Sequence, residues 1–126
     1  MTQPCPFCPL VNRKIYLEND LSIGILDGFP ISNGHSLIIP KRHVGSIFDI
    51  QKDELLSLFN LLADVRNKLT EQFSPDGFNI GINDNEAAGQ TINHVHIHLI
   101  PRYKGDQEDP RGGIRWIFPD KAKYWE

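Results

Sequence analysis

Hydrophobic residues follow two periods along this chain, one typical of strands and one typical of a helix. Short segments in which apolar residues alternate with polar ones or run together predict β-strands at residues 14–18, 21–26, 36–39 and 78–83. Between Asp49 and Phe73 the apolar residues recur every three or four positions, which predicts one long amphipathic helix with Asp49 as its N-cap.

The last predicted strand carries the most informative pattern. Residues 94–101 read HVHIHLIP, so His94, His96 and His98 alternate with aliphatic residues. Side chains two positions apart lie on the same face of a strand, so the aliphatic residues face the core and the three imidazoles share the opposite face. An apolar strand does not need three histidines in order to fold. Because imidazole can act as nucleophile, acid, base or metal ligand, the row indicates chemistry.

These elements predict an α+β fold, with an antiparallel sheet of about five strands, one long amphipathic helix and an irregular C-terminal tail. The loop 84–90 joins two of the strands, which we therefore expect to be antiparallel neighbours. The tail, residues 103–126, is rich in Gly, Pro and charge, and its Trp116 and Trp125 are candidate anchors against the domain or a partner. At 126 residues the chain fits a single domain, residues 1–126.

Composition and charge exclude several classes of partner. The chain is 40% hydrophobic and carries a formal net charge of −3, whereas proteins that coat nucleic acid or an anionic membrane present a basic face. We therefore expect no nucleic-acid and no membrane partner, while small anionic ligands stay compatible with this charge. No apolar run approaches the roughly 20 residues that span a bilayer, and the N-terminal residues show no targeting signal, so we expect a cytoplasmic protein.

The two cysteines of the chain, Cys5 and Cys8, are three positions apart. In a reduced protein such a C-x-x-C pair indicates metal binding or redox work rather than a disulfide framework. The three histidines of the last strand do not suit one shared ion, because His94 and His98 are about 13 Å apart along a strand while metal–nitrogen bonds measure about 2 Å. We therefore expect the rings either to act on successive parts of an extended anionic substrate or to serve two separate sites.

Residues 94–100 resemble the signature of the histidine triad (HIT) proteins, in which three histidines alternate with hydrophobic residues. The resemblance extends to residues 27–30, 34–43 and 89–91, which occur in the family's order and spacing. Together these segments cover most of residues 5–103. The chain is thus identified as a member of the HIT superfamily, similar to bacterial HIT hydrolases with a zinc-type Cys-x-x-Cys, and a HIT-like fold is implied.

The resemblance implies nucleotidyl chemistry centred on His96. In the family the middle histidine attacks the α-phosphorus of a nucleoside phosphate derivative, and water or another acceptor then releases a nucleoside monophosphate from the nucleotidyl-histidine. A neutral imidazole nitrogen suits this role, since it is a better nucleophile than water and its phosphoramidate stays labile. By the same resemblance, His98 contacts the phosphate and protonates the leaving group, while His35 supports the site.

The resemblance also implies a set of substrate-binding residues. Asp27 takes the position that binds the ribose hydroxyls, and Asn83, Gln90 and Thr91 take positions that hold the phosphates. The residues by themselves leave structural roles open. Asp27 could shape a turn, Thr91 could be an ordinary strand residue, and His35 could be a histidine satisfied at a strand end.

A structural zinc site is implied as well. Some bacterial HIT proteins, and the related galactose-1-phosphate uridylyltransferases, carry zinc on a C-x-x-C pair, a histidine after the proline-ending strand and the first histidine of the triad. Here these positions are Cys5, Cys8, His43 and His94, a donor set that suits tetrahedral structural zinc. The alternative is two buried free thiols and a surface His43. No organic cofactor is implied.

Several branches of the family would fit the chain. They include phosphoramidases, dinucleoside polyphosphate hydrolases, scavengers of capped nucleotides and nucleotidyltransferases. His98 favours hydrolysis, because the transferase branch usually has glutamine there. We therefore expect a hydrolase that acts on dinucleoside polyphosphates or nucleoside phosphoramidates, with a nucleotidyltransferase or a nucleotide-binding regulatory protein as the alternatives. Apolar residues near Phe7, Ile23 and Ile25 are candidates for purine selectivity.

Two further expectations concern the tail and the assembly. Arg111 and Arg115 could reach a polyphosphate, since guanidinium pairs well with phosphate oxygens, or they could be solvated or paired with tail carboxylates. Family members are usually symmetric homodimers, so a homodimer is expected here too.

Overall fold

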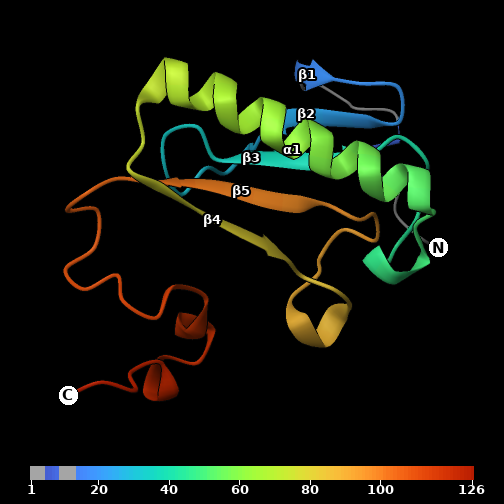
Figure 1. Cartoon of the computed structure of the whole chain (residues 1–126). Helices are drawn as coiled ribbons and strands as arrows, with labels where there is room; N and C mark the ends of the chain where they lie inside the picture. Colours follow the sequence, from blue (N-terminus) through green and yellow to red (C-terminus); the bar gives the residue numbers. More distant parts are fainter. Residues whose placement is uncertain (1–4, 9–13) are drawn as a thin grey trace.

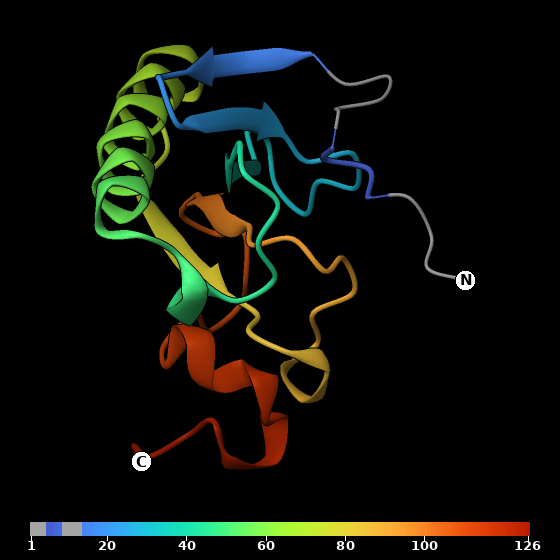
Figure 2. The ribbon, with the colours of Figure 1, turned by 90° about the vertical axis from the view of Figure 1, so that its right-hand side faces the viewer.

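The structure, a computed structural model, describes residues 5–8 and 14–126. It confirms the predicted fold: a five-stranded antiparallel sheet in the order β1-β2-β3-β5-β4 with one long helix, α1, across one face (Figures 1 and 2). The elements are β1 (Ile15–Glu18), β2 (Ser22–Leu26), β3 (Ser36–Pro40), α1 (Lys52–Phe73), β4 (Gly77–Ile82) and β5 (Ile97–Arg102). Short 3-10 turns are η1 (Ile47–Asp49), η2 (Glu86–Ala88), η3 (Gly113–Ile117) and η4 (Pro119–Lys121).

The main core lies between α1 and the sheet. The buried helix residues recur at three- and four-residue spacing and pack on buried strand residues of β3 and β5; they are Leu58, Leu61, Leu62, Val65 and Leu69 against Ile38, Ile97 and Leu99. Gly24 of β2 allows the helix to approach closely, because a Cβ atom there would lie only 2.9 Å from Cγ2 of Val65.

The beginning of the helix differs from the prediction. Asp49 is not its N-cap, since it lies in η1, and α1 starts at Lys52 after the N-cap Gln51. The Gln51 N–H donates to Oε1 of Glu54 at 2.8 Å, so a carboxylate in the first turn satisfies a backbone donor. Glu54 in turn is almost fully buried and accepts from Arg42 at 2.7 Å, which fixes the start of the helix to the segment after β3.

The histidine segment is extended, but its strand pairing begins later than predicted. β5 starts at Ile97, because the His94 N–H bonds to the Ile92 carbonyl and the Val95 N–H to the Val44 carbonyl instead of to a neighbouring strand. The alternation itself is confirmed, with Val95, Ile97 and Leu99 buried. The predicted antiparallel pairing of residues 78–83 with this segment is also confirmed, as β4 with β5.

The tail after β5 runs along the end of the molecule away from the helix (Figure 2). Its η3 turn lies against β4, since Ile114 Cδ1 is 3.8 Å from where a Cβ atom of Gly81 would be. The arginines are held within the tail: Arg111 pairs with Asp109 at 3.0 Å, and Arg115 donates to the Ala122 carbonyl at 2.9 Å. Across the described residues, no helix has the length and apolar character needed to cross a membrane.

Candidate functional site

A cleft of about 730 Å³ opens beside the start of β5. It contains His35, His96 and His98 together with the predicted substrate-binding residues Asp27, Asn83 and Thr91. It lies on the sheet face opposite α1, because Ile97 and Leu99 point to the helix and side chains alternate along a strand. Among the described residues that line the cleft, none is lysine or arginine.

His96 is fixed by a single hydrogen bond to the backbone. The side chain is 7% exposed, and its Nδ1 lies 2.8 Å from the carbonyl oxygen of His94. A carbonyl can only accept, so the proton is on Nδ1 and Nε2 keeps its lone pair. The edge-to-face contact with Phe7, at 5.6 Å between ring centroids, holds the ring from a second direction. With the proton on Nδ1, His96 can present the lone pair of Nε2 to the cleft.

His35 sets the tautomer of His98. The Ile31 N–H donates to Nδ1 of His35 at 3.2 Å, so the proton of His35 is on Nε2. Nε2 of His35 lies 3.0 Å from Nδ1 of His98, and the N–H donates across that distance. The proton of His98 is consequently on Nε2. The Ile31 amide thus fixes the tautomer of His35, and His35 in turn fixes which nitrogen of His98 can donate.

The electrostatics keep both of these rings neutral. Burial lowers the pKa of His98, and the neighbouring His96 and His35 rings lower it further, against an opposing effect of Asp27. Burial also lowers the pKa of His35, again opposed by Asp27. A neutral His98 can offer a hydrogen bond from Nε2 to a phosphate oxygen or a leaving atom without carrying a full charge.

Asp27 shapes a turn and also lines the cleft. Its Oδ1 accepts from the Phe29 N–H at 2.8 Å, which shapes the turn after β2. Its Oδ2 lies 3.4 Å from Nε2 of His35 and 4.0 Å from Nδ1 of His98, at the border of the cleft. The carboxylate therefore lies next to the histidines and within the cleft.

The side chain of Gln90 is used differently from those of Asn83 and Thr91. Its Oε1 accepts from the Asn85 N–H at 2.7 Å, and its Nε2 donates to the Gly45 carbonyl at 2.8 Å. It is also not among the residues that line the cleft. In this structure the Gln90 amide orders the loop around the cleft rather than facing it.

The proposed purine contacts lie deeper than expected. Phe7 and Ile25 are buried in a cluster with Leu37 and Ile39, against which Ile23 packs. Phe7, Ile23 and Ile25 do not line the cleft, whereas Leu37 and Ile92 do. Phe7 and its neighbours thus support the apolar wall of the cleft from beneath.

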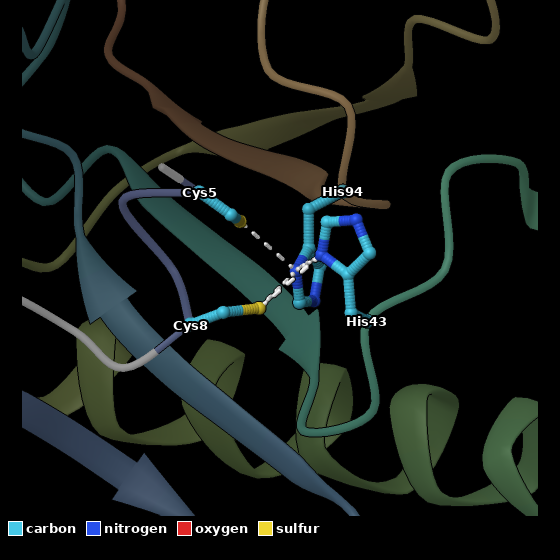
Figure 3. Close-up of side chains that lie close together, drawn as sticks. All are labelled: Cys5, Cys8, His43 and His94. Carbon is cyan, nitrogen blue, oxygen red and sulfur yellow. Dashed lines mark hydrogen bonds between the residues drawn. The ribbon is translucent and has the colours of Figure 1, made fainter. Parts of the chain in front are cut away.

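The four predicted metal ligands come together in one cluster (Figure 3). Sγ of Cys8 lies 3.0 Å from Nδ1 of His94 and 3.3 Å from Nδ1 of His43. Sγ of Cys5 lies 3.4 Å from Nδ1 of His94, and the two Nδ1 atoms are 3.2 Å apart. A tetrahedral zinc ion separates its sulfur and nitrogen ligands by about 3.3–3.8 Å. The separations given above are close to this range, and all four ligand atoms lie within 4.8 Å of one another, so the residues fit a zinc ion.

The hydrogen bond at the other nitrogen of His94 supports the same fit. Nε2 of His94 lies 2.8 Å from the Pro40 carbonyl, so it carries the proton and Nδ1 presents its lone pair to the sulfurs. Burial and the neighbouring Cys5 raise the pKa of Cys8 to about 11. Two adjacent thiolates are therefore unfavourable without a cation between them, and zinc would supply that charge.

A second group of possible ligands, Asp27, His35 and His98, also lies close together. It does not suit a metal. An ion on Nε2 of His35 would require the proton to be on Nδ1, where the Ile31 N–H already points at it. The hydrogen bond at the other ring nitrogen thus favours a metal at His94, whereas at His35 it favours a hydrogen bond to His98.

Several functional groups of the site are invisible in the sequence. The carbonyls of His94 and Pro40 and the amide of Ile31 are backbone groups, and any residue type provides them. Ile114 and Trp116 of the tail also line the cleft. The aromatic residues of the tail were a signal for packing, but nothing in the pattern placed them beside the histidines.

Comparison with known proteins identifies the family of the chain. The model of the HIT domain family matches residues 11–105. An uncharacterized HIT-like protein of Methanocaldococcus jannaschii is 36% identical over 82% of this chain and 83% of its own length. The adenosine 5'-monophosphoramidase hnt1 of Schizosaccharomyces pombe is 31% identical over 94% of this chain and 90% of its own length. A bis(5'-nucleosyl)-tetraphosphatase of the same yeast is 40% identical over 76% of this chain, which spans 53% of that protein.

Solved structures show the same architecture. A HIT family protein of Bacillus anthracis superposes with a TM-score of 0.78 at 33% identity, over 84% of this chain and 78% of that one. A zinc-bound histidine triad family protein of Mycobacterium smegmatis gives a TM-score of 0.76 at 33% identity, over 83% of this chain and 79% of that one.

Proposed function

Because this chain belongs to the HIT domain family, we propose that it is a nucleotide hydrolase that works through a nucleotidyl intermediate on His96. The observation that carries the proposal is the hydrogen bond from Nδ1 of His96 to the His94 carbonyl, which leaves the Nε2 lone pair free in the cleft. Relatives named as a tetraphosphatase and a monophosphoramidase support nucleotide hydrolysis at the level of the family.

In the proposed reaction, Nε2 of His96 attacks the α-phosphorus of a purine nucleotide. The new P–N bond forms as the bond from phosphorus to the leaving group breaks, and the leaving group departs with that electron pair. Water then attacks the same phosphorus, breaks the P–N bond and releases the nucleoside monophosphate. Two displacements, linked by a labile phosphoramidate intermediate on His96, replace one difficult hydrolysis.

The other cleft residues would bind and orient the substrate. The Nε2–H of His98 would donate to the phosphate or to the leaving atom, with His35 holding that tautomer. Asp27 would accept from the ribose hydroxyls, and the Asn83 amide and Thr91 hydroxyl would donate to phosphate oxygens. Gln90 would act through the order of its loop. With no lysine or arginine among the described lining residues, phosphate binding rests on neutral donors.

We further propose that Cys5, Cys8, His43 and His94 hold a structural zinc ion. The zinc-bound relative and the donor geometry described above support it. All four ligand positions would be occupied by protein, so the ion would have no open position for a substrate and would act by fixing the N-terminal turn to His94. It would contribute folding energy and no chemical step.

The chain is also proposed to act as a homodimer of single HIT domains. β4 is an edge strand, and its Ile80 is half exposed, so a second copy could extend the sheet and cover this apolar side chain. Sedimentation at micromolar concentration tests this: a monomer at all concentrations contradicts it.

Trapping the intermediate tests the function. Rapid quench during turnover of an adenosine 5'-phosphoramidate or diadenosine tetraphosphate should give a protein whose mass is increased by one adenylyl group, with the label on His96. His96→Ala should lose the adduct and at least about a thousandfold of kcat. Activity that survives in His96→Ala overturns the mechanism. Binding of nucleotide without turnover in the wild type would favour a regulatory protein, and transfer of the nucleotide to a phosphate acceptor would favour a transferase.

A further inference from the structure

Asn85, in the loop 84–90 beside the cleft, has a strained backbone. Its φ is 79° and its ψ is 164°, a combination almost confined to glycine, because a Cβ atom crowds the backbone there. Among the described residues, the other non-glycine residue with a positive φ is Ser74, whose ordinary left-handed conformation ends α1. A conformation such as that of Asn85 persists only where surrounding contacts hold it.

Gln90 holds Asn85 with two hydrogen bonds. Its side-chain Oε1 accepts from the Asn85 N–H at 2.7 Å, and its own backbone N–H donates to the Asn85 carbonyl at 3.1 Å. The Nε2 atom of the same side chain donates to the carbonyls of Gly45 at 2.8 Å and of Ile92 at 3.0 Å. An amide has two N–H groups, so in this arrangement Gln90 has none left for a phosphate.

The loop is also anchored at its start. Oδ1 of Asp84 accepts from the Ser46 hydroxyl at 2.8 Å and from the Ile47 N–H at 3.1 Å. Asp84 and Gln90 thus attach the two ends of the loop to residues 45–47. A relaxation of the Asn85 backbone would therefore cost one or more of these hydrogen bonds.

The residues of this region that face the cleft lie directly beside the strained turn. Asn83, Gly89 and Thr91 line the cleft, and each is within two positions of Asn85 or Gln90. Neutral donors must meet a phosphate oxygen at a short distance and within a limited range of angles, whereas a lysine or arginine charge acts over a longer range. Because the described lining contains neither lysine nor arginine, phosphate binding depends on where the loop holds Asn83 and Thr91.

We propose that Gln90 and Asn85 are a positioning pair for the substrate phosphate: the Gln90 amide locks the strained Asn85 backbone and so holds the Asn83 and Thr91 donors in place before the substrate binds. This rests on the proposed binding of a nucleotide in the cleft. Gln90 does not touch the phosphate. The strain makes the loop dependent on Gln90, since without the amide Asn85 relaxes to an ordinary conformation and displaces the donors.

A double-mutant cycle tests the proposal. Gln90→Met keeps the length of the side chain and removes its hydrogen bonds, and it should lower kcat/KM for an adenosine 5'-phosphoramidate by about tenfold. In the Asn85→Gly background the same backbone conformation carries no strain, so the loss caused by Gln90→Met should shrink to about threefold or less. Ala88→Gly is the matched control, because it places a glycine in the same loop at a position without a positive φ. In that background the loss should stay at about tenfold.

An equal loss in all three backgrounds overturns the proposal, since a direct contact of Gln90 with phosphate would not depend on the backbone of Asn85. A loss that shrinks as much with Ala88→Gly as with Asn85→Gly overturns it too, because the loop would then respond to flexibility alone. Unchanged kcat/KM in Gln90→Met has the same meaning.

Hydrogen exchange at the Asn85 amide is a second readout, and it needs no ligand. The amide should exchange at least about tenfold faster in Gln90→Met than in the wild type, while urea unfolding in the presence of zinc shows that the fold is retained. An unchanged exchange rate overturns the proposal. If the wild type cleaves no nucleotide, the proposed function fails instead, and the exchange rates together with the affinities of the same variants for adenosine 5'-monophosphate decide the inference.

Discussion

Nδ1 of His96 donates to the carbonyl oxygen of His94 across 2.8 Å, and His94 is also the residue that faces both cysteines. One residue therefore offers its ring to the proposed metal site and its backbone to the proposed nucleophile, His96. Phe7 joins the two in a second way, because it lies between the cysteines in the chain and packs against the rings of both His94 and His96. The proposed zinc ligand His94 and the proposed nucleophile His96 are two positions apart in the chain.

Loss of the metal should therefore affect catalysis as well as stability. We expect one zinc per chain in the purified protein and none in Cys8→Ser. That variant should melt at a lower temperature and lose about tenfold in kcat with little change in KM, since the substrate pocket itself is retained. Metal analysis, thermal unfolding and steady-state kinetics measure the three effects. The same three losses after chelation, and their recovery on adding zinc, serve as the control, and a metal-free active wild type contradicts the site.

Replacing His35 should change the tautomer of His98. His35→Phe removes the N–H that donates to Nδ1 of His98, so its proton is no longer held on Nε2. We expect a fall in kcat of about tenfold or more and a change in the imidazole nitrogen shifts of His98 in nuclear magnetic resonance spectra. His35→Gln keeps a donor and an acceptor in the side chain and should recover part of the rate. Equal rates in the two variants would show that His35 only fills space.

Stability should fall on mild acidification. The folded protein holds the pKa values of His35 and His98 below the ordinary value, so below about pH 6.5 the unfolded chain binds more protons than the folded one. The free energy of unfolding then decreases as the pH falls from 6.5 towards these lowered values, and it is insensitive to these two groups above 7. Urea unfolding at several pH values in the presence of zinc measures the slope. His98→Gln should show a shallower slope than the wild type.

The helix packing gives a prediction about stability alone. Leu69 is fully buried between α1 and the sheet, so Leu69→Ala should lower the free energy of unfolding by about 3 kcal/mol. Leu56 is on the same helix but mostly exposed. Leu56→Ala should therefore change the free energy of unfolding by no more than about 0.5 kcal/mol. Urea unfolding of the two variants compares them. Similar losses would mean that the exposed face of the helix is covered by a partner.

The sequence predicted what depends on side-chain periodicity and missed what depends on backbone groups. The spacing of leucines along 49–73 is visible without a structure, because a helix must bury one face. Its first residue was misplaced because Asp49 is the better N-cap by residue type, whereas in the folded chain Glu54 accepts from the Gln51 N–H and from Arg42 and so fixes the start after Gln51. In the same way, no residue type signals that the Ile31 amide controls two histidines.

Other differences come from competition between partners. By its position in the sequence, the Gln90 side chain resembles a phosphate ligand. In the folded chain its amide is instead hydrogen-bonded to the backbone N–H of Asn85 and the carbonyl of Gly45. Arg111 and Arg115 are likewise satisfied inside the tail. The sequence offered both alternatives for these arginines, and only the path of the tail distinguishes them.

β5 lies between two other strands of the sheet, which limits local unfolding around His98. His98 is paired with Leu37 of β3 on one side and with Gly81 of β4 on the other, so this part of the chain cannot detach as a fraying edge does. The tail has no strand pairing in the described part of the chain; it is held by its own turn hydrogen bonds and by side-chain contacts such as that of Ile114 with β4. The cleft is thus lined both by histidines on or next to paired strands and by Ile114 and Trp116 of the tail, which is held by different contacts. Substitutions of these two tail residues should therefore reshape the wall of the cleft while the geometry of the histidines is preserved.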